Sequence, residues 1–224
     1  MTDKKTRTSR TTKPKLADPI DLTPEMIEDH IEYAINGKFR DNNLKYNLLV
    51  QHNLSCKHSY IVREMLTIII GGREHNPNKL GYDAIKENVE SKSTVYSKNC
   101  RIRASYNTTD YTLERLMKDR NNNVVYLCSG FTDFGRLIFI FEIPFSAIDP
   151  KFQIQINKWL AKQKRAKKPK KGNYLRSANF SYLDFIDHPE TKVIFYNPEF
   201  SNYVVCNLKA YLNEKTGGNR VSPR

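Results

Sequence analysis

Residues Gly81–Lys98 have the sequence GYDAIKENVESKSTVYSK, and this stretch predicts the centre of the fold. Two runs within it, Tyr82–Lys86 and Val89–Tyr96, have the character of short strands. Glu87-Asn88 between them suits a two-residue turn, because Asn tolerates the positive φ that such turns need. The sequence therefore predicts a β-hairpin here.

This hairpin would collect three charged side chains. Side chains alternate between the two faces of a strand, so Asp83, Glu90 and Lys92 would share one face. Asp83 would lie directly opposite Lys92, with Glu90 diagonal to it. Carboxylates are hard oxygen ligands for Mg²⁺, and a bound divalent ion lowers the pKa of its water. A lysine beside them can orient or deprotonate that water, so the pattern favours a phosphodiester substrate.

Asp83, a spacer and Glu90-Ser91-Lys92 resemble the D…(D/E)-x-K signature of the PD-(D/E)xK nuclease superfamily. That superfamily includes many type II restriction endonucleases and the archaeal junction resolvases. The resemblance implies that Asp83 and Glu90 bind the metal and that Lys92 is catalytic. The chain departs from the family pattern in two places: Tyr82 stands where the family has Pro, and the spacer is short.

The resemblance also suggests a role for Glu64 on the helix that precedes the hairpin. In the resembled family, a glutamate at such a place often joins the metal site. The alternative is a surface glutamate that pairs with Lys57 or Arg63.

An acid-x-Lys triplet occurs four times in the chain, so the triplet alone is weak evidence. Glu90-Ser91-Lys92 is the instance that joins two strand-like runs with an aspartate in phase upstream. Its main rival, Glu190-Thr191-Lys192, follows Pro189 and is expected in a loop. The alternative for residues 83–92 is an ordinary solvent-facing hairpin with a cross-strand ion pair.

The net charge of +13 is concentrated in two segments. Residues 1–15 carry +5 and residues 158–171 carry +8, so the rest of the chain is neutral overall. This placement favours a polyanion as partner, and we expect double-stranded DNA. The alternative is a solvated tail plus a solubility-raising loop. A nuclear-localisation signal is a further reading of the second segment.

Two groups of side chains are candidates for DNA contact. Arg101 and Arg103 share one face of an extended segment, where the alternative is a solvated strand face. The second group lies in the basic loop 161–172 and just after it, and consists of Lys162, Lys164, Arg165, Lys167, Lys168, Lys170, Lys171, Asn173 and Arg176. Asn173, Arg176 and Asn179 could read bases, and the alternative for them is ordinary turn and surface chemistry.

Chain length and composition suit one domain over 18–213, preceded by a disordered basic arm at 1–17 and followed by a polar tail at 214–224. The four cysteines are scattered, which argues against a zinc site or a disulfide framework. No segment approaches the ~20 apolar residues of a membrane span, and no signal sequence is visible. We therefore expect no membrane partner and a cytoplasmic location.

The predicted fold is α/β, with a mixed central sheet flanked by helices and a helical N-terminal elaboration. Helices are expected between Thr23 and Gly37 and over 40–53, 57–70, 110–119 and 152–163, the fourth capped by residues 107–110. In the second helix, Leu44, Leu48 and Leu49 are expected to face inward. Apolar runs at 124–129 and 136–145 predict a central hairpin, and 192–197 predicts a late strand. Residues 204–212 fit either a strand or a helix. The order of elements over 57–145 resembles the restriction-endonuclease core.

The function expected from these observations is a Mg²⁺-dependent endonuclease that cuts DNA at specific sites, as a type II restriction enzyme does. A homodimer is expected if the target is palindromic, because the symmetry of the protein then matches that of the DNA. Two alternatives remain open. One is a structure-specific nuclease, such as a junction resolvase or repair nuclease, and the other is a non-catalytic nucleic-acid-binding protein.

Overall fold

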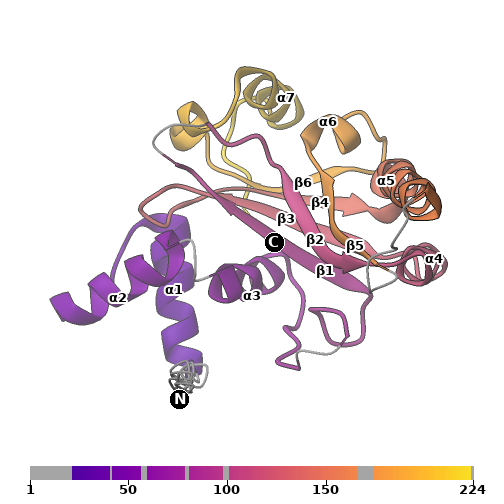
Figure 1. Ribbon diagram of the computed structural model, residues 1–224. Coiled ribbons are helices and arrows are strands. Elements are labelled where there is room, and N and C mark those ends of the chain that lie inside the picture. The colour runs from indigo at the N-terminus through magenta and orange to yellow at the C-terminus, as the bar shows by residue number, and fades with distance from the viewer. Residues whose placement is uncertain are drawn as a thin grey trace, which may run out of the picture.

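The computed structural model describes residues 22–40, 42–56, 60–78, 81–97, 101–165 and 174–222. Three helices come first along these residues, and strands and helices are mixed after them. A mixed sheet lies between layers of helices, as the sequence predicts (Figure 1). The strand order in the sheet is β1-β3-β4-β6. Its members are β1 (Val89–Val95), β3 (Val125–Phe131), β4 (Leu137–Pro144) and β6 (Lys192–Tyr196).

The predicted central hairpin is confirmed. β3 and β4 pair antiparallel and occupy the two inner positions of the sheet, which explains their near-continuous apolar sequences. β6 continues antiparallel beside β4, whereas β1 pairs parallel with β3 at the edge. β1 therefore has one side of its backbone open to other groups, and this edge becomes the candidate site.

One face of the sheet is covered by α1 (Pro24–Asn36), α2 (Leu44–Ser55) and α3 (Tyr60–Ile70) (Figure 1). α1 begins and ends as predicted: the Thr23 hydroxyl accepts a hydrogen bond from Met26 N, and Gly37 adopts φ 73°. The apolar side chains of α3 pack against the inner strands on this face.

The buried face of α2 was predicted wrongly. Leu44 and Leu48 are exposed at 71% and 55%, instead of facing inward. The inward face is formed by Tyr46, Val50 and Leu54, which recur every four residues and pack with the core. α2 carries apolar residues on two faces, so periodicity alone could not select the buried one.

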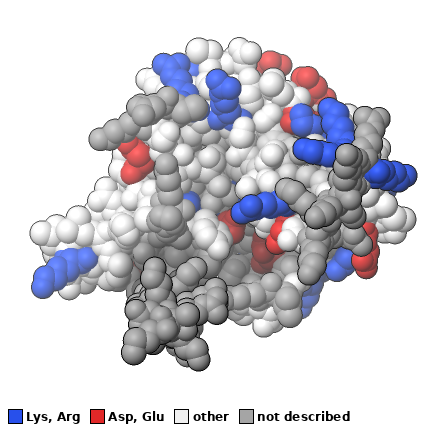
Figure 2. All heavy atoms as spheres, in the orientation of Figure 1, with Lys and Arg blue, Asp and Glu red and all other residues white. Residues whose placement is uncertain are grey.

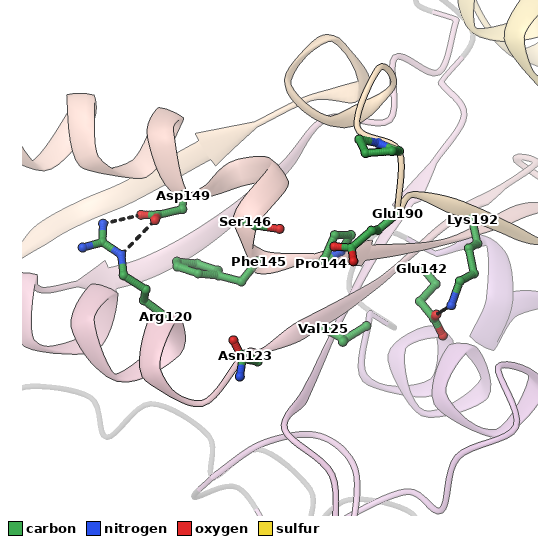
Figure 3. Close-up of a pocket in the computed structure, with 11 residues that line it drawn as sticks. Arg120, Asn123, Val125, Glu142, Pro144, Phe145, Ser146, Asp149, Glu190 and Lys192 are labelled. Atoms are coloured by element: carbon green, nitrogen blue, oxygen red, sulfur yellow. Dashed lines mark hydrogen bonds and ion pairs between the residues drawn. The ribbon is translucent and has the colours of Figure 1, made fainter.

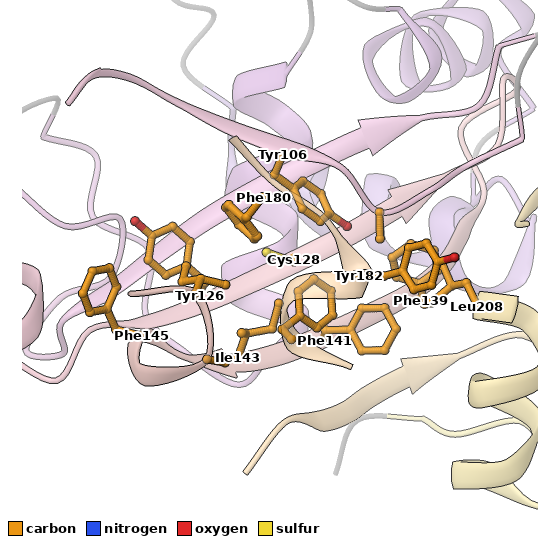
Figure 4. Packing of buried hydrophobic residues seen from close by; sticks show 14 of the residues in the cluster. Tyr106, Tyr126, Cys128, Phe139, Phe141, Ile143, Phe145, Phe180, Tyr182 and Leu208 are labelled. Atoms are coloured by element: carbon orange, nitrogen blue, oxygen red, sulfur yellow. The ribbon is translucent and has the colours of Figure 1, made fainter. Parts of the chain in front are cut away.

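The opposite face of the sheet carries an aromatic-rich core that includes Tyr126, Phe139, Phe141 and Phe180 (Figure 4). It is covered by an antiparallel ribbon of β2 (Tyr106–Tyr111) and β5 (Leu175–Phe180) and by helical elements. These are α4 (Leu113–Asn121), α5 (Phe145–Arg165), α6 (Tyr182–Phe185), the 3-10 helix η1 (Pro198–Tyr203) and α7 (Cys206–Thr216).

Three further differences from the predicted elements affect the site. Residues 82–86 are not a strand of a hairpin, and residues 107–110 belong to β2 instead of capping a helix. Thr112 is the N-cap of α4, where its hydroxyl accepts from Arg115 N. Residues 175–180, for which no strand is predicted, form β5.

Residues 206–216 are helical, which decides the ambiguous segment near the C-terminus. Within the described ranges, no helix has both the length and the apolar character needed to cross a bilayer.

Candidate active site at the edge of β1

β1 places Glu90 and Lys92 on one face of the sheet. Glu90 is 6% exposed and the Lys92 side chain 17%. Lys92 Nζ donates to Glu90 Oε2 at 3.3 Å and to the Ser91 carbonyl at 2.8 Å. The two side chains point the same way because they are two residues apart in a strand, as predicted. The Glu90-Ser91-Lys92 triplet is therefore largely buried, unlike the exposed ion pair of a solvent-facing hairpin.

Asp83 reaches this edge by a different route from the predicted hairpin. Asp83 N donates to Val89 O at 2.8 Å, and Ser91 N donates to Asp83 Oδ2 at 2.7 Å. Asp83 is thus bonded to the backbone beside Glu90 and does not lie opposite Lys92 in a hairpin register. Its carboxylate satisfies an edge N–H group that no strand pairs.

Apart from the bond from Asp83 N to Val89 O, the segment around Asp83 pairs with the preceding loop, where His75 and Ala84 form a bridge. Asn76 N donates to Asp83 O, and Ile85 N donates to Glu74 O, both at 2.8 Å. Lys86 has φ 66°, which turns the chain sharply before β1 begins. The positive φ falls one residue before the predicted turn, so the expected strand pairing cannot form.

α3 contributes Glu64 to the same place. Ser91 Oγ donates to the Glu64 carbonyl at 3.0 Å, which fixes α3 against β1. The Glu64 carboxylate itself makes no hydrogen bond or close ion pair among the described residues, although it lines a cavity with Glu90 and Lys92. Arg63, one expected partner, instead donates to the carbonyl groups of Leu54 and Cys56.

Burial raises the pKa of Glu64 to about 7, and the charges of Asp83 and Glu90 act in the same direction, against the opposing effect of Lys92. Glu64, Glu90 and Lys92 line one cavity, and Asp83 is bonded to Ser91, which lies between Glu90 and Lys92 in β1. The structure therefore brings together the four residues proposed from the sequence.

Glu90 and Lys92 each favour the charged form of the other. Burial raises the pKa of Glu90, although Lys92 and Arg115 oppose this effect. Burial alone would lower the pKa of Lys92, but Glu90, Glu64 and Asp83 outweigh it and keep that pKa above its ordinary value. Lys92 is consequently a cation in this arrangement, suited to donating a hydrogen bond to a negatively charged oxygen.

Arg115 on α4 is a site residue that sequence reasoning missed. Its Nη2 donates to Glu90 Oε1 at 2.6 Å, so Glu90 lies between two cations. Arg115 Nε also lies 3.7 Å from Asp119 Oδ2, and Asp119 in turn accepts from the Tyr111 hydroxyl at 2.8 Å. The i,i+4 pair was readable in the sequence. The contact with Glu90 was not readable, because β2 separates β1 from α4 in the sequence.

A cavity of about 410 Å³ opens over these groups. Its walls combine the charged residues with the polar side chains of Ser93, Ser105, Asn107 and Thr109. Nearby, the hydroxyl groups of Thr108 and Tyr126 are buried close to each other, yet neither makes a hydrogen bond of normal geometry within the described residues. The cavity is therefore polar and contains unused hydrogen-bonding capacity.

The oxygen donors here could hold a hard divalent cation. No group of three or more His, Cys, Asp and Glu side chains forms a ready ligand set in the described part of the chain. Mg²⁺ does not need one, because it keeps several waters and uses one or two carboxylates. Asp83 and Glu90 are the candidate ligands, and the unbonded carboxylate of Glu64 is the third.

The structure describes some of the predicted DNA-binding residues. Arg101 and Arg103 are exposed and their neighbours Ile102 and Ala104 are buried, which confirms the predicted alternation. Arg176 is exposed on β5. Lys162 and Lys164 are exposed on the last turns of α5, and Arg165 ends that helix. The remaining candidates, Lys167, Lys168, Lys170, Lys171 and Asn173, lie outside the described residues.

Lys and Arg side chains on the face seen in Figure 2 are spread among neutral and acidic ones. On that face, the described residues do not form one continuous basic surface. This agrees with the sequence, in which the positive charge is concentrated in two segments.

A second hollow, of about 670 Å³, lies between α4, the start of α5 and the segment before β6 (Figure 3). Four of its five charged side chains are bonded to each other, and the fifth, Glu190, is exposed. Arg120 donates two hydrogen bonds to Asp149, at 2.8 and 2.7 Å, and Lys192 donates to Glu142 at 2.8 Å. This hollow is larger than the one over Glu90, but it shows no unbonded buried carboxylate.

Comparison with protein-family models and with curated proteins finds no match to this chain, so the functional argument rests on the residues and their geometry.

Proposed function

We propose that this protein is a Mg²⁺-dependent endonuclease that hydrolyses phosphodiester bonds in double-stranded DNA, with the sequence specificity of a type II restriction enzyme. The observation that carries the proposal is the buried Glu90–Lys92 pair on one face of β1, with the carboxylates of Asp83 and Glu64 beside it. Clustering like charges in a partly buried site costs stability, and active sites are where such perturbed groups cluster.

Each residue has a chemical role in this proposal. Asp83 and Glu90 would hold the metal ion, and Glu64 would complete the site on the α3 side. A bound Mg²⁺ would supply an acidified water and neutralise charge on the phosphate. Lys92 would orient the attacking water or stabilise the charged oxygen of the scissile phosphate. Attack by water would leave a 5′-phosphate and a 3′-hydroxyl, as the family resemblance implies.

The arrangement of elements supports the resemblance to the PD-(D/E)xK core. A helix, α3, precedes the strand that carries the motif, another helix, α4, follows it, and the motif strand lies in a mixed sheet. A homodimer belongs to the proposal, because a palindromic target would be matched by two-fold protein symmetry.

The test is digestion of a plasmid library that contains many different sites, with Mg²⁺ or with a chelator. Discrete fragments that appear only with Mg²⁺ are expected. Cleavage that follows branched or damaged DNA instead of a fixed sequence would show a structure-specific nuclease. Salt-sensitive DNA binding without cutting in Mg²⁺ or Mn²⁺ would contradict the proposal and show a non-catalytic binding protein.

A further inference from the structure

A polar stripe leads from the candidate active site along one side of β2 and of residues 101–105, which precede it. Between residues 101 and 109, every odd-numbered residue is exposed and every even-numbered residue is buried. The exposed side chains are Arg101, Arg103, Ser105, Asn107 and Thr109. The stripe thus begins with guanidinium groups and ends with an amide and a hydroxyl group beside Glu90 and Lys92.

The hollows along this stripe share lining residues. Ser105 and Asn107 line both the cavity over Glu90 and a neighbouring hollow of about 370 Å³. Ser105 also lines a third hollow, of about 430 Å³, together with Arg103. One extended partner could therefore contact the whole stripe and the candidate active site at the same time.

β5 adds a second row of polar side chains beside the stripe. In the antiparallel ribbon, Asn107 pairs with Asn179 and Thr109 pairs with Ser177. Side chains directly opposite each other have Cβ atoms ~5 Å apart, so the two amides form one hydrogen-bonding surface. Asn107 and Asn179 are both exposed, and both line the 370 Å³ hollow.

The ribbon is held rigidly below this surface. Gln155 of α5 accepts from Asn179 N at 2.9 Å and donates to Asn179 O at 2.7 Å, which fixes the edge of β5. The Ser177 hydroxyl donates to Asn179 Oδ1 at 2.9 Å and leaves the amide NH₂ group available. The Asn107 amide has no hydrogen-bond partner in the described ranges.

We propose that the outer face of the β2–β5 ribbon enters a groove of the DNA duplex and that Asn107 and Asn179 read base edges there. This rests on the proposed function for the identity of the partner. The major groove admits a two-stranded β-ribbon, and an asparagine amide matches the donor and acceptor pair of adenine. Arg103, near the start of the stripe, would contact a phosphate.

The chemistry of this face argues against a protein partner. Asn107, Thr109, Ser177 and Asn179 offer amide and hydroxyl groups and no large apolar side chain. The centres of protein–protein interfaces are instead rich in aromatic and apolar side chains.

The experiment is selection of bound duplexes from a pool with a randomised central region, in Ca²⁺ so that binding is measured separately from cutting. Wild type is compared with Asn107→Ala and Asn179→Ala. Each variant should lose preference at one position of the selected sequence by roughly tenfold, while total binding changes less. Asn107→Ala is the cleaner variant because no hydrogen bond of the described protein is removed.

Asn202→Ala, at an exposed position of η1, is the matched control and should select the same sequence as wild type. An unchanged selected sequence in both ribbon variants would overturn the inference, and so would a wild-type protein that selects no sequence at all. Failure of the nuclease proposal is seen separately, as absence of cutting in Mg²⁺, because the selection does not depend on cleavage.

Discussion

The two charged hollows of this protein differ in what their charges contact. In the larger one, Arg120 pairs with Asp149 and Lys192 with Glu142, and the cations of both pairs are at least 47% exposed. In the smaller one, Glu90 and Lys92 are mostly buried, and a third carboxylate, Glu64, has no bonded partner among the described residues. Size therefore does not single out the hollow that we propose as the active site.

The two hollows differ in significance because burying a charged side chain costs free energy. Exposed ion pairs are screened by water and contribute little to stability, so their presence needs no function to explain it. Buried carboxylates that repel each other lower stability. The hollow over Glu90 retains such groups, which is expected where the site is completed by a cation or a substrate.

The largest expected effect is on Lys92. Lys92→Met removes the group proposed to act on the attacking water, and Mg²⁺-dependent cleavage should fall about 10³-fold. Lys192→Met is the matched control, because Lys192 also bonds a glutamate but lies in the larger hollow. It should cut at the wild-type rate in the same plasmid assay. If Lys92→Met and Lys192→Met lost cleavage equally, the hollow over Glu90 could no longer be distinguished from the larger one as the active site.

The next largest effect concerns pH. The pKa of Glu64 is about 7 in the metal-free folded protein, above its ordinary value of 4.5. The folded state therefore binds more protons than the unfolded state between these values, and this group makes stability fall as pH rises through that window. The change should reach at most about 3 kcal/mol at pH 8.

Chemical denaturation at pH 5 and pH 8 would measure this change, with a chelator present. Glu64→Gln should be stabilised relative to wild type on going from pH 5 to pH 8, because it lacks the titrating group. An identical pH dependence in wild type and Glu64→Gln would show that Glu64 is not in a costly environment.

Arg115 gives a smaller effect. Arg115→Gln leaves Glu90 buried with Lys92 as its remaining cation, and the free energy of unfolding should fall by about 1–2 kcal/mol. Cleavage should fall by roughly tenfold, because Glu90 loses the contact that positions it. Arg115→Lys should restore part of the stability and less of the activity, since one ammonium group cannot contact Glu90 and Asp119 as the guanidinium does. Equal rates for wild type and Arg115→Gln would limit Arg115 to a structural role.

The smallest effect is expected at Asp149. Asp149→Asn breaks an exposed bidentate pair with Arg120, and stability should change by less than about 1 kcal/mol. Cleavage and DNA selection should be unchanged. A loss of cutting that exceeds the loss of stability would place function in the larger hollow.

Several parts of this arrangement were predictable from local sequence. The apolar runs of β3 and β4 identify central strands, and the spacing of Glu90 and Lys92 places both on one face of β1. The alternation of Arg101 and Arg103 with buried neighbours follows the same rule. These predictions succeed because strand geometry depends on neighbouring residues alone.

Other parts depend on contacts between distant segments. Asp83 reaches β1 through a loop bonded to residues 74–76, which no periodicity signals. Arg115 meets Glu90 only because α4 packs beside β1. Residues 107–110 have the composition of a helix cap, and their pairing with residues 175–180 overrides that local preference.

The central claim is that Glu90 and its neighbours bind a divalent metal ion. The most direct test is to measure Mn²⁺ binding by electron paramagnetic resonance, with duplex DNA present. The wild-type protein should bind Mn²⁺, Glu90→Gln should lose that binding, and Asp149→Asn should retain it. The account would be contradicted if the wild type bound no Mn²⁺, or if Glu90→Gln bound it as the wild type does.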